Sequence, residues 1–143
     1  MYTFILVVDS AQQVFTAQGI AARIGVVREE IGGRSIVEGL NGPHDGWLAV
    51  SAFNSDGYDC DEESYERLKI LIEATKINNP RFFLVEGRDT NSSLANELLM
   101  SLDVNIKTVI DNDHGLIEEL IVFRRLAEMG VDWLYKSGSP RFD

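Results

Sequence analysis

Runs of hydrophobic residues of strand length recur along the chain, separated by polar or turn-forming residues. The first run, residues 2–8, is apolar at nearly every position, which is typical of a strand buried on both faces in the interior of a sheet. Runs at 35–40 and 47–53 flank a segment of turn formers, 41–46, and predict an antiparallel hairpin. Two later runs predict further strands: 81–86 and 106–110.

Between these runs, hydrophobic residues recur every three or four positions, as they do on one face of a helix. These segments begin after residues that cap helices, or end at Gly or Pro, which stop them. They predict four helices, or three if the first segment does not form one, because Gly19 and Gly25 lower its helix propensity. The first segment carries its apolar residues between 14 and 27 and runs up to Gly32, and the others are 62–77, 94–102 and 116–129.

The alternation of strands and helices predicts the fold class. Strand–helix–strand connections of this length permit crossovers between parallel strands. We therefore expect residues 1–143 to form a single α/β domain. Its sheet is expected to be mixed and mostly parallel, with four or five strands, one antiparallel hairpin and three or four flanking helices. We also expect the apolar segment 131–135 to dock on the body and residues 137–143 to fray.

Charge narrows the classes of partner. The chain carries 23 acidic and 13 basic residues, a net charge of −10, which disfavours nucleic acid and anionic membranes as partners. No run approaches the roughly 20 apolar residues of a membrane span. The one cysteine, Cys60, excludes an internal disulfide, as is typical of a reducing compartment. We therefore expect a cytoplasmic protein with a cationic partner.

The densest charge lies between residues 56 and 66, where six carboxylates occur without a lysine or arginine. A helix start explains Asp61, Glu62 and Glu63, because carboxylates there stabilise the positive end of the helix dipole. Asp56, Asp59 and Glu66 add negative potential close in sequence to aromatic residues. A surface that attracts a basic protein and anchors it would combine the same two features. We predict a partner-binding segment, with a solvated loop and helix cap as the alternative. Its residues are Asp56, Tyr58, Asp59, Asp61, Glu62, Glu63 and Glu66.

A second group of acids follows predicted strands. Asp9 ends the first strand, and Asp111, Asp113 and His114 lie in a polar turn after a later one. If those strands are adjacent and parallel, the four side chains converge at one edge of the sheet, where they could hold a divalent cation or act in acid–base chemistry. The alternative is a polar turn in which Asp113 caps the next helix.

The remaining chemistry gives no positive signal. The spacing of Asp56, Asp59 and Asp61 does not match a calcium-binding EF-hand loop, and we predict no metal. Glycine-rich dinucleotide and phosphate-binding motifs are missing from the sequence, so we predict no cofactor. Together the patterns favour an acidic binding protein over an enzyme. We expect a bacterial immunity protein that inhibits a basic toxin nuclease, with a small enzyme or ligand-binding domain using the strand-end acids as the alternative.

Overall fold

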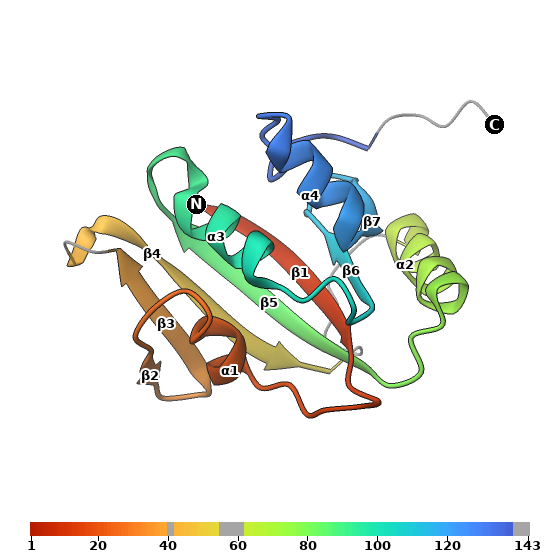
Figure 1. The fold of residues 1–143 in the computed structure, drawn as a ribbon, viewed down its shortest axis with the longest axis horizontal. Helices are drawn as coiled ribbons and strands as arrows, with labels where there is room; N and C mark the ends of the chain where they lie inside the picture. The colour runs from red at the N-terminus through yellow and green to blue at the C-terminus, as the bar shows by residue number, and fades with distance from the viewer. Residues whose placement is uncertain (40–41, 55–61, 139–143) are drawn as a thin grey trace.

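The computed structural model describes residues 1–39, 42–54 and 62–138, without the side chains of 42–44 and 91. The described residues form one seven-stranded sheet in the order β2-β3-β4-β5-β1-β6-β7, and every neighbouring pair of strands is antiparallel (Figure 1). The strands are β1 (Tyr2–Asp9), β2 (Arg28–Glu30), β3 (Arg34–Gly39), β4 (Gly42–Phe53), β5 (Pro80–Arg88), β6 (Thr108–Asp111) and β7 (Ile117–Glu119).

Helices cover both faces of the sheet unequally. Three of them, α1 (Ala17–Ala21), α3 (Ser93–Ser101) and α4 (Leu120–Glu128), pack with the buried Trp133 and Leu134 on one face. A short 3-10 turn, Thr90–Ser92, leads into α3. The helix α2 (Glu62–Thr75) packs on the other face, near the β6–β7 end of the sheet (Figure 1). The described residues therefore form two hydrophobic clusters with β1 between them.

The position of β1 follows from its sequence. Leu6 and Val8 belong to the larger cluster, whereas Val7 belongs to the smaller one under α2. Because side chains alternate across a strand, a run that is apolar at both phases can be buried only in a sheet covered on both sides. The prediction of an interior strand over residues 2–8 is confirmed, with β5 and β6 as its neighbours.

The predicted mostly parallel sheet of four or five strands is wrong. The helical connections do not place parallel strands side by side. β5 and β6, joined through α3, are both antiparallel to β1 and flank it, so they run parallel to one another with β1 between them. β4 and β5, joined through α2, pair antiparallel from Phe53 opposite Phe82 onward. That connection leaves and re-enters the sheet at the same end.

Two short strands replace parts of predicted helices. The first helix is only five residues long, with the Thr16 side chain accepting a hydrogen bond from Gly19 N at 2.9 Å. Gly32 and Gly33 have positive φ values of 97° and 82° and reverse the chain, so that 28–30 pairs with β3. Likewise 117–119 pairs with β6 before α4 begins. The hairpin of β3 and β4 is confirmed, but the predicted turn at 41–46 is wrong, because β4 begins at Gly42, which pairs with Gly39. The docking of 131–135 through Trp133 and Leu134 is confirmed.

Side chains, rather than a helix, cover the β3–β4 part of the α2 face. The guanidinium carbon of Arg34 lies 5.1 Å from the ring centroid of Trp47. Trp47 itself is half-buried, whereas Ile36 and Ala49, which share this face, are 5% and 1% exposed. The arginine is held between Glu30 at 3.5 Å and Glu86 at 3.9 Å. Arginine and tryptophan thus shield apolar sheet residues through their own apolar surface.

Candidate functional site

The helix α2 is anchored by one side only. Tyr65, Leu68, Leu71 and Ile72 pack against the cluster formed by β1, β5, β6 and β7. Leu68 is its one fully buried residue. A helix held by a single apolar stripe leaves its opposite side to solvent, so the remaining positions of α2 are available to a partner.

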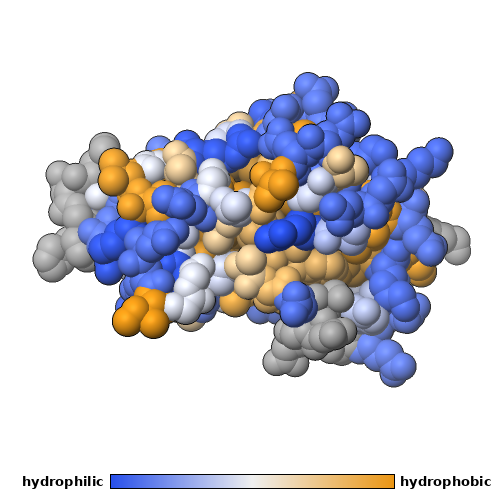
Figure 2. All heavy atoms as spheres, turned by 90° about the horizontal axis from the view of Figure 1, so that it is seen from below, coloured by the Kyte–Doolittle hydropathy of each residue, from blue (hydrophilic) through white to orange (hydrophobic). Residues whose placement is uncertain are grey.

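The exposed side of α2 is acidic and contains an apolar residue. Glu62, Glu63, Glu66 and Glu73 are exposed, and Ile70 is 64% exposed. Residues three and four apart are neighbours on a helix surface, which places Glu66 and Glu73 beside Ile70. Lys69 lies 3.4 Å from Glu66, but both side chains are more than half exposed, and such pairs contribute little. In Figure 2 the end of the molecule that carries α2 is predominantly hydrophilic.

The turn between β6 and β7 is organised by Asn112, which is fully buried. Its Oδ1 accepts hydrogen bonds from His114 N at 2.9 Å and Leu116 N at 3.1 Å. Its Nδ2 donates to the carbonyls of Trp133 at 2.8 Å and Lys136 at 2.7 Å. One buried amide therefore shapes the turn and attaches the C-terminal segment, and its hydrogen-bonding groups are satisfied as burial requires.

This geometry leaves Asp113 and His114 exposed. Asp113 has a φ of 64°, a left-handed conformation that Asp tolerates better than most residues, and its backbone N–H donates to Asp111 Oδ1 at 2.9 Å. The His114 ring packs against Tyr135, with ring centroids 5.2 Å apart. Tyr135 is itself 47% exposed.

A contact between α2 and this turn joins the two candidate sites that the sequence presents separately. Arg67 Nη1 donates to the Gly115 carbonyl at 3.2 Å. The first turns of α2 and the β6–β7 turn therefore lie side by side. We call the combined surface the α2–turn surface. It consists of Glu62, Glu63, Glu66, Asp113, His114 and Tyr135, all of them exposed.

The predicted partner-binding segment is only partly described. Glu62, Glu63 and Glu66 lie in the first turns of α2, as expected for a helix that starts near residue 61. The other predicted residues of this segment lie outside the described residues: Asp56, Tyr58, Asp59 and Asp61.

The strand-end acids are not all brought together. β1 and β6 are adjacent but antiparallel, with Ile5 opposite Asp111, and Asp9 N donates to Lys107 O at the other end of β6. Four residues of extended chain separate Ile5 from Asp9, a distance of about 13 Å. Asp9 Oδ1 instead accepts from Ala11 N and Asn79 N at 3.1 and 3.2 Å. Only Asp111, Asp113 and His114 share a location, and Asp111 is 5% exposed.

The described residues contain no group of three or more His, Cys, Asp or Glu side chains arranged to hold a metal ion. A marked electrostatic perturbation occurs elsewhere, at Tyr2. Burial, followed by the hydrogen bond that its hydroxyl donates to Asp89, raises the pKa of Tyr2 far above its usual range. Asp89 also accepts from Leu94 N at 2.9 Å at the start of α3. This pair therefore ties β1 to α3 and has a structural role.

Sequence reasoning did not identify Ile70 and Tyr135 as surface residues. Ile70 carried a usable signal, because it falls off the stripe formed by Tyr65, Leu68 and Leu71. Tyr135 carried none, since its exposure depends on how Asn112 attaches the C-terminal segment.

Comparisons with known proteins add no assignment, because no family model, no curated protein and no solved structure matches this chain. Across the part of the chain that the structure describes, none of the helices has the length and apolar character needed to cross a membrane.

Proposed function

We propose that this chain is a cytoplasmic binding protein that neutralises a basic protein partner, and that the α2–turn surface contributes to the contact. The partner we infer is a toxin nuclease, which makes the chain a bacterial immunity protein. A nuclease needs a basic surface to attract phosphate. An acidic inhibitor gains fast, steered association with that same surface and can obstruct it.

One observation carries the proposal: exposed carboxylates from two separate elements share a surface with an exposed aromatic ring. Glu62, Glu63 and Glu66 come from α2, Asp113 comes from the β6–β7 turn, and Tyr135 lies against His114. Aromatic residues are enriched among the residues that dominate binding energy, and the surrounding charges control the association rate and the choice of partner. Ile70, further along α2, offers an additional apolar contact.

The strand-end acids support an enzyme less well. General acid–base catalysis needs side chains within hydrogen-bonding reach of one reacting group, and about 13 Å separates the strand positions of Asp9 and Asp111. Asp111 is buried and engaged with the backbone of its own turn.

The direct test is inhibition of a nuclease. If a neighbouring gene encodes a large secreted protein with a basic C-terminal domain, that domain should be produced and its nuclease activity measured with increasing amounts of this chain. We expect loss of activity at a one-to-one ratio. An unrelated basic nuclease should keep its activity under the same conditions. Full activity of the neighbour's domain at excess chain contradicts the proposal.

A further inference from the structure

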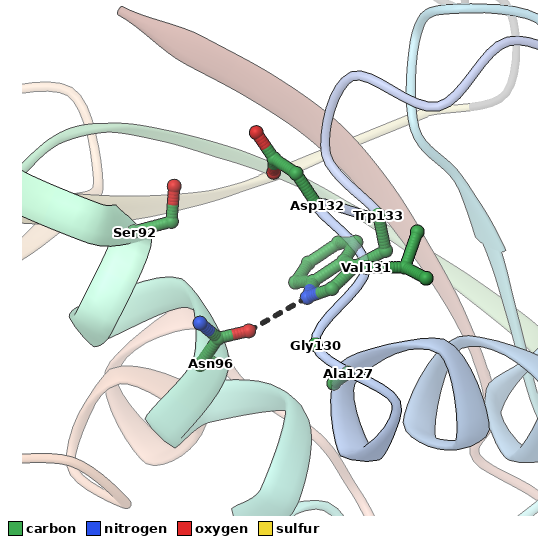
Figure 3. A pocket seen from close by; sticks show the side chains of 7 residues that line it. All are labelled: Ser92, Asn96, Ala127, Gly130, Val131, Asp132 and Trp133. Atoms are coloured by element: carbon green, nitrogen blue, oxygen red, sulfur yellow. Dashed lines mark hydrogen bonds between the residues drawn. The ribbon is translucent and has the colours of Figure 1, made fainter.

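A small cavity lies between the start of α3 and the segment that follows α4, outside the α2–turn surface. Its volume is about 260 Å³. Ser92 and Asn96 line it from the α3 side, and Val131, Asp132 and Trp133 line it from the other side (Figure 3). A cavity of this size admits one amino-acid residue and is smaller than a typical pocket for a drug-sized ligand.

The hydrogen bond drawn in Figure 3 fixes the orientation of the Asn96 amide. Trp133 Nε1 lies 2.8 Å from Asn96 Oδ1. An indole N–H can only donate, so the oxygen of Asn96 must be the atom that faces it. The Nδ2 group is left with two N–H donors, and it has no hydrogen-bond partner among the described residues. The cavity therefore presents a donor held in place by a nearly buried tryptophan, which is 1% exposed.

The other polar groups supply negative charge and acceptors. Asp132 is the one charged residue among those lining the cavity, and its side chain is not paired with any described residue. Ser92 makes no side-chain capping bond to α3, so its hydroxyl is available as well. A carboxylate and a fixed amide donor that line the same cavity complement a ligand that carries both a cation and a carbonyl oxygen.

We propose that this cavity binds one lysine or arginine residue of a polypeptide partner. The backbone carbonyl of that residue accepts from Asn96 Nδ2, and its cationic side chain donates to Asp132. Ala127 and Val131 contact the methylene groups of the side chain, which gain from burial beside apolar residues. This inference rests on the proposed function, because it names how the basic partner is held once charge has steered it to the surface.

The cavity lies close in the chain to the α2–turn surface. Tyr135 N donates to Asp132 O at 3.3 Å, and Tyr135 packs against His114. A three-residue segment thus runs from the cavity to the exposed aromatic pair. A partner that contacts Tyr135 lies within reach of Asp132.

The test uses the whole chain without any partner. The 15N-labelled protein is titrated with N-acetyl-lysine amide, and the indole N–H of Trp133 and the side-chain amide of Asn96 are followed by NMR. A Trp47→Phe variant identifies which of the two indole signals belongs to Trp133. We expect saturable shifts of both reporters, with a dissociation constant on the order of millimolar, as one small ligand permits.

Two comparison ligands separate charge from shape. N-acetyl-norleucine amide keeps the carbonyl and the four side-chain carbons but lacks the charged amine, and butylamine keeps the charge but lacks the carbonyl. Both are expected to bind about tenfold more weakly or worse, since each loses one polar contact. Equal binding of either one overturns the proposal, because the cavity would then not recognise the combination.

A matched pair of variants locates the site. Asp132→Asn should weaken binding of N-acetyl-lysine amide about tenfold, whereas Asp103→Asn, an exposed carboxylate in another loop, should leave it unchanged. If N-acetyl-lysine amide does not shift the Trp133 signal, this inference is refuted, whereas the proposed role of the α2–turn surface is unaffected. Conversely, loss of the proposed function leaves the titration result standing.

Discussion

Ile5 and Asp111 lie directly opposite one another in the antiparallel pair of β1 and β6. This register carries the C-terminal end of β1, and with it Asp9, away from the turn that holds Asp113 and His114. In that turn the Gly115 carbonyl accepts a hydrogen bond from Arg67, which places the turn beside α2. The strand pairing therefore separates Asp9 from the other strand-end acids, and the Arg67 contact groups the acids of the proposed binding surface.

Magnesium or manganese should not stabilise the protein. A ligand that binds the folded state raises the melting temperature, and the register of β1 and β6 does not assemble Asp9 with Asp111 into such a site. We expect the same melting temperature at about 5 mM magnesium, roughly fivefold above a millimolar dissociation constant, as without it. Differential scanning fluorimetry checks this. A rise that Asp111→Asn abolishes would instead support the enzyme alternative.

Tyr2→Phe should lower the free energy of unfolding by about 1–3 kcal/mol, because it removes a hydrogen bond to a charged acceptor. The hydroxyl of Tyr2 donates to Asp89, which also holds the first turn of α3. Urea denaturation at neutral pH measures the loss. Tyr135→Phe is the matched control, since Tyr135 is 47% exposed, and it should change the free energy by no more than about 0.5 kcal/mol.

The same tyrosine should make stability depend on alkaline pH. Burial and Asp89 raise the pKa of Tyr2 in the folded chain above its unfolded value, which is about 10 for an ordinary tyrosine. Above that pH the unfolded chain loses the proton while the folded chain keeps it, so this part of the stability is complete below about pH 10 and falls by up to about 1.4 kcal/mol per pH unit above it. Between about pH 9 and 11, the free energy of unfolding should therefore fall less with pH in Tyr2→Phe than in the wild type. Equal slopes in both proteins contradict the assignment.

Asn112→Ala should destabilise the protein by about 3 kcal/mol or more, because it leaves buried backbone groups without partners. The amide now bonds His114 N, Leu116 N and two carbonyls of the C-terminal segment. Asn105→Ala, at an exposed position, should change stability by less than about 0.5 kcal/mol. Equal urea midpoints for the two variants would mean that Asn112 does not hold the turn.

Local patterns predicted elements better than they predicted topology. The uninterrupted apolar run of residues 2–8 required burial on both faces, and the stripe of Tyr65, Leu68 and Leu71 required a helix on the sheet. Strand direction had no such signal. Whether β5 and β6 pair with each other or with β1 is decided by long-range packing, so the expectation of parallel neighbours was wrong.

The acids of the candidate site were visible in the sequence, but their grouping was not. Glu62, Glu63 and Glu66 stood out as a run without basic residues. The neighbourhood of Asp113 and His114 depends on Arg67 reaching Gly115 across the fold. In the sequence Asn112 is not distinguishable from the other polar residues of its turn. Its structural role follows from its burial beneath the C-terminal segment.

Association with the basic partner should slow steeply as salt rises. Exposed charges attract one another over roughly 10 Å at 0.1 M salt and over less at higher salt. We therefore expect the association rate constant to fall at least about tenfold between low and physiological ionic strength, with a smaller change in the dissociation rate. Stopped-flow fluorescence measures both. An association rate that salt does not alter would count against steering.

Charge reversal on α2 tests the central claim most directly. Replacing Glu62, Glu63 and Glu66 with Lys adds two charges at each of three positions and takes the net charge from −10 to −4. The matched control reverses Glu29, Glu97 and Glu128, which are exposed elsewhere, and produces the same net charge. Loss of Glu62 and Glu63 from the first turn should cost about 0.3–1 kcal/mol each, so circular dichroism and urea unfolding must first establish that both variants fold.

The decisive quantity is the dissociation constant for the basic nuclease domain, measured by calorimetry for the wild type and both variants. We predict a loss of at least about a hundredfold for the α2 variant, because reversal removes attraction and adds like-charge contacts that cost several kcal/mol. The control should lose less than about tenfold, since it changes only the long-range field. Equal losses in the two variants, or unchanged affinity in the α2 variant, would contradict the assignment of the α2–turn surface as the binding face.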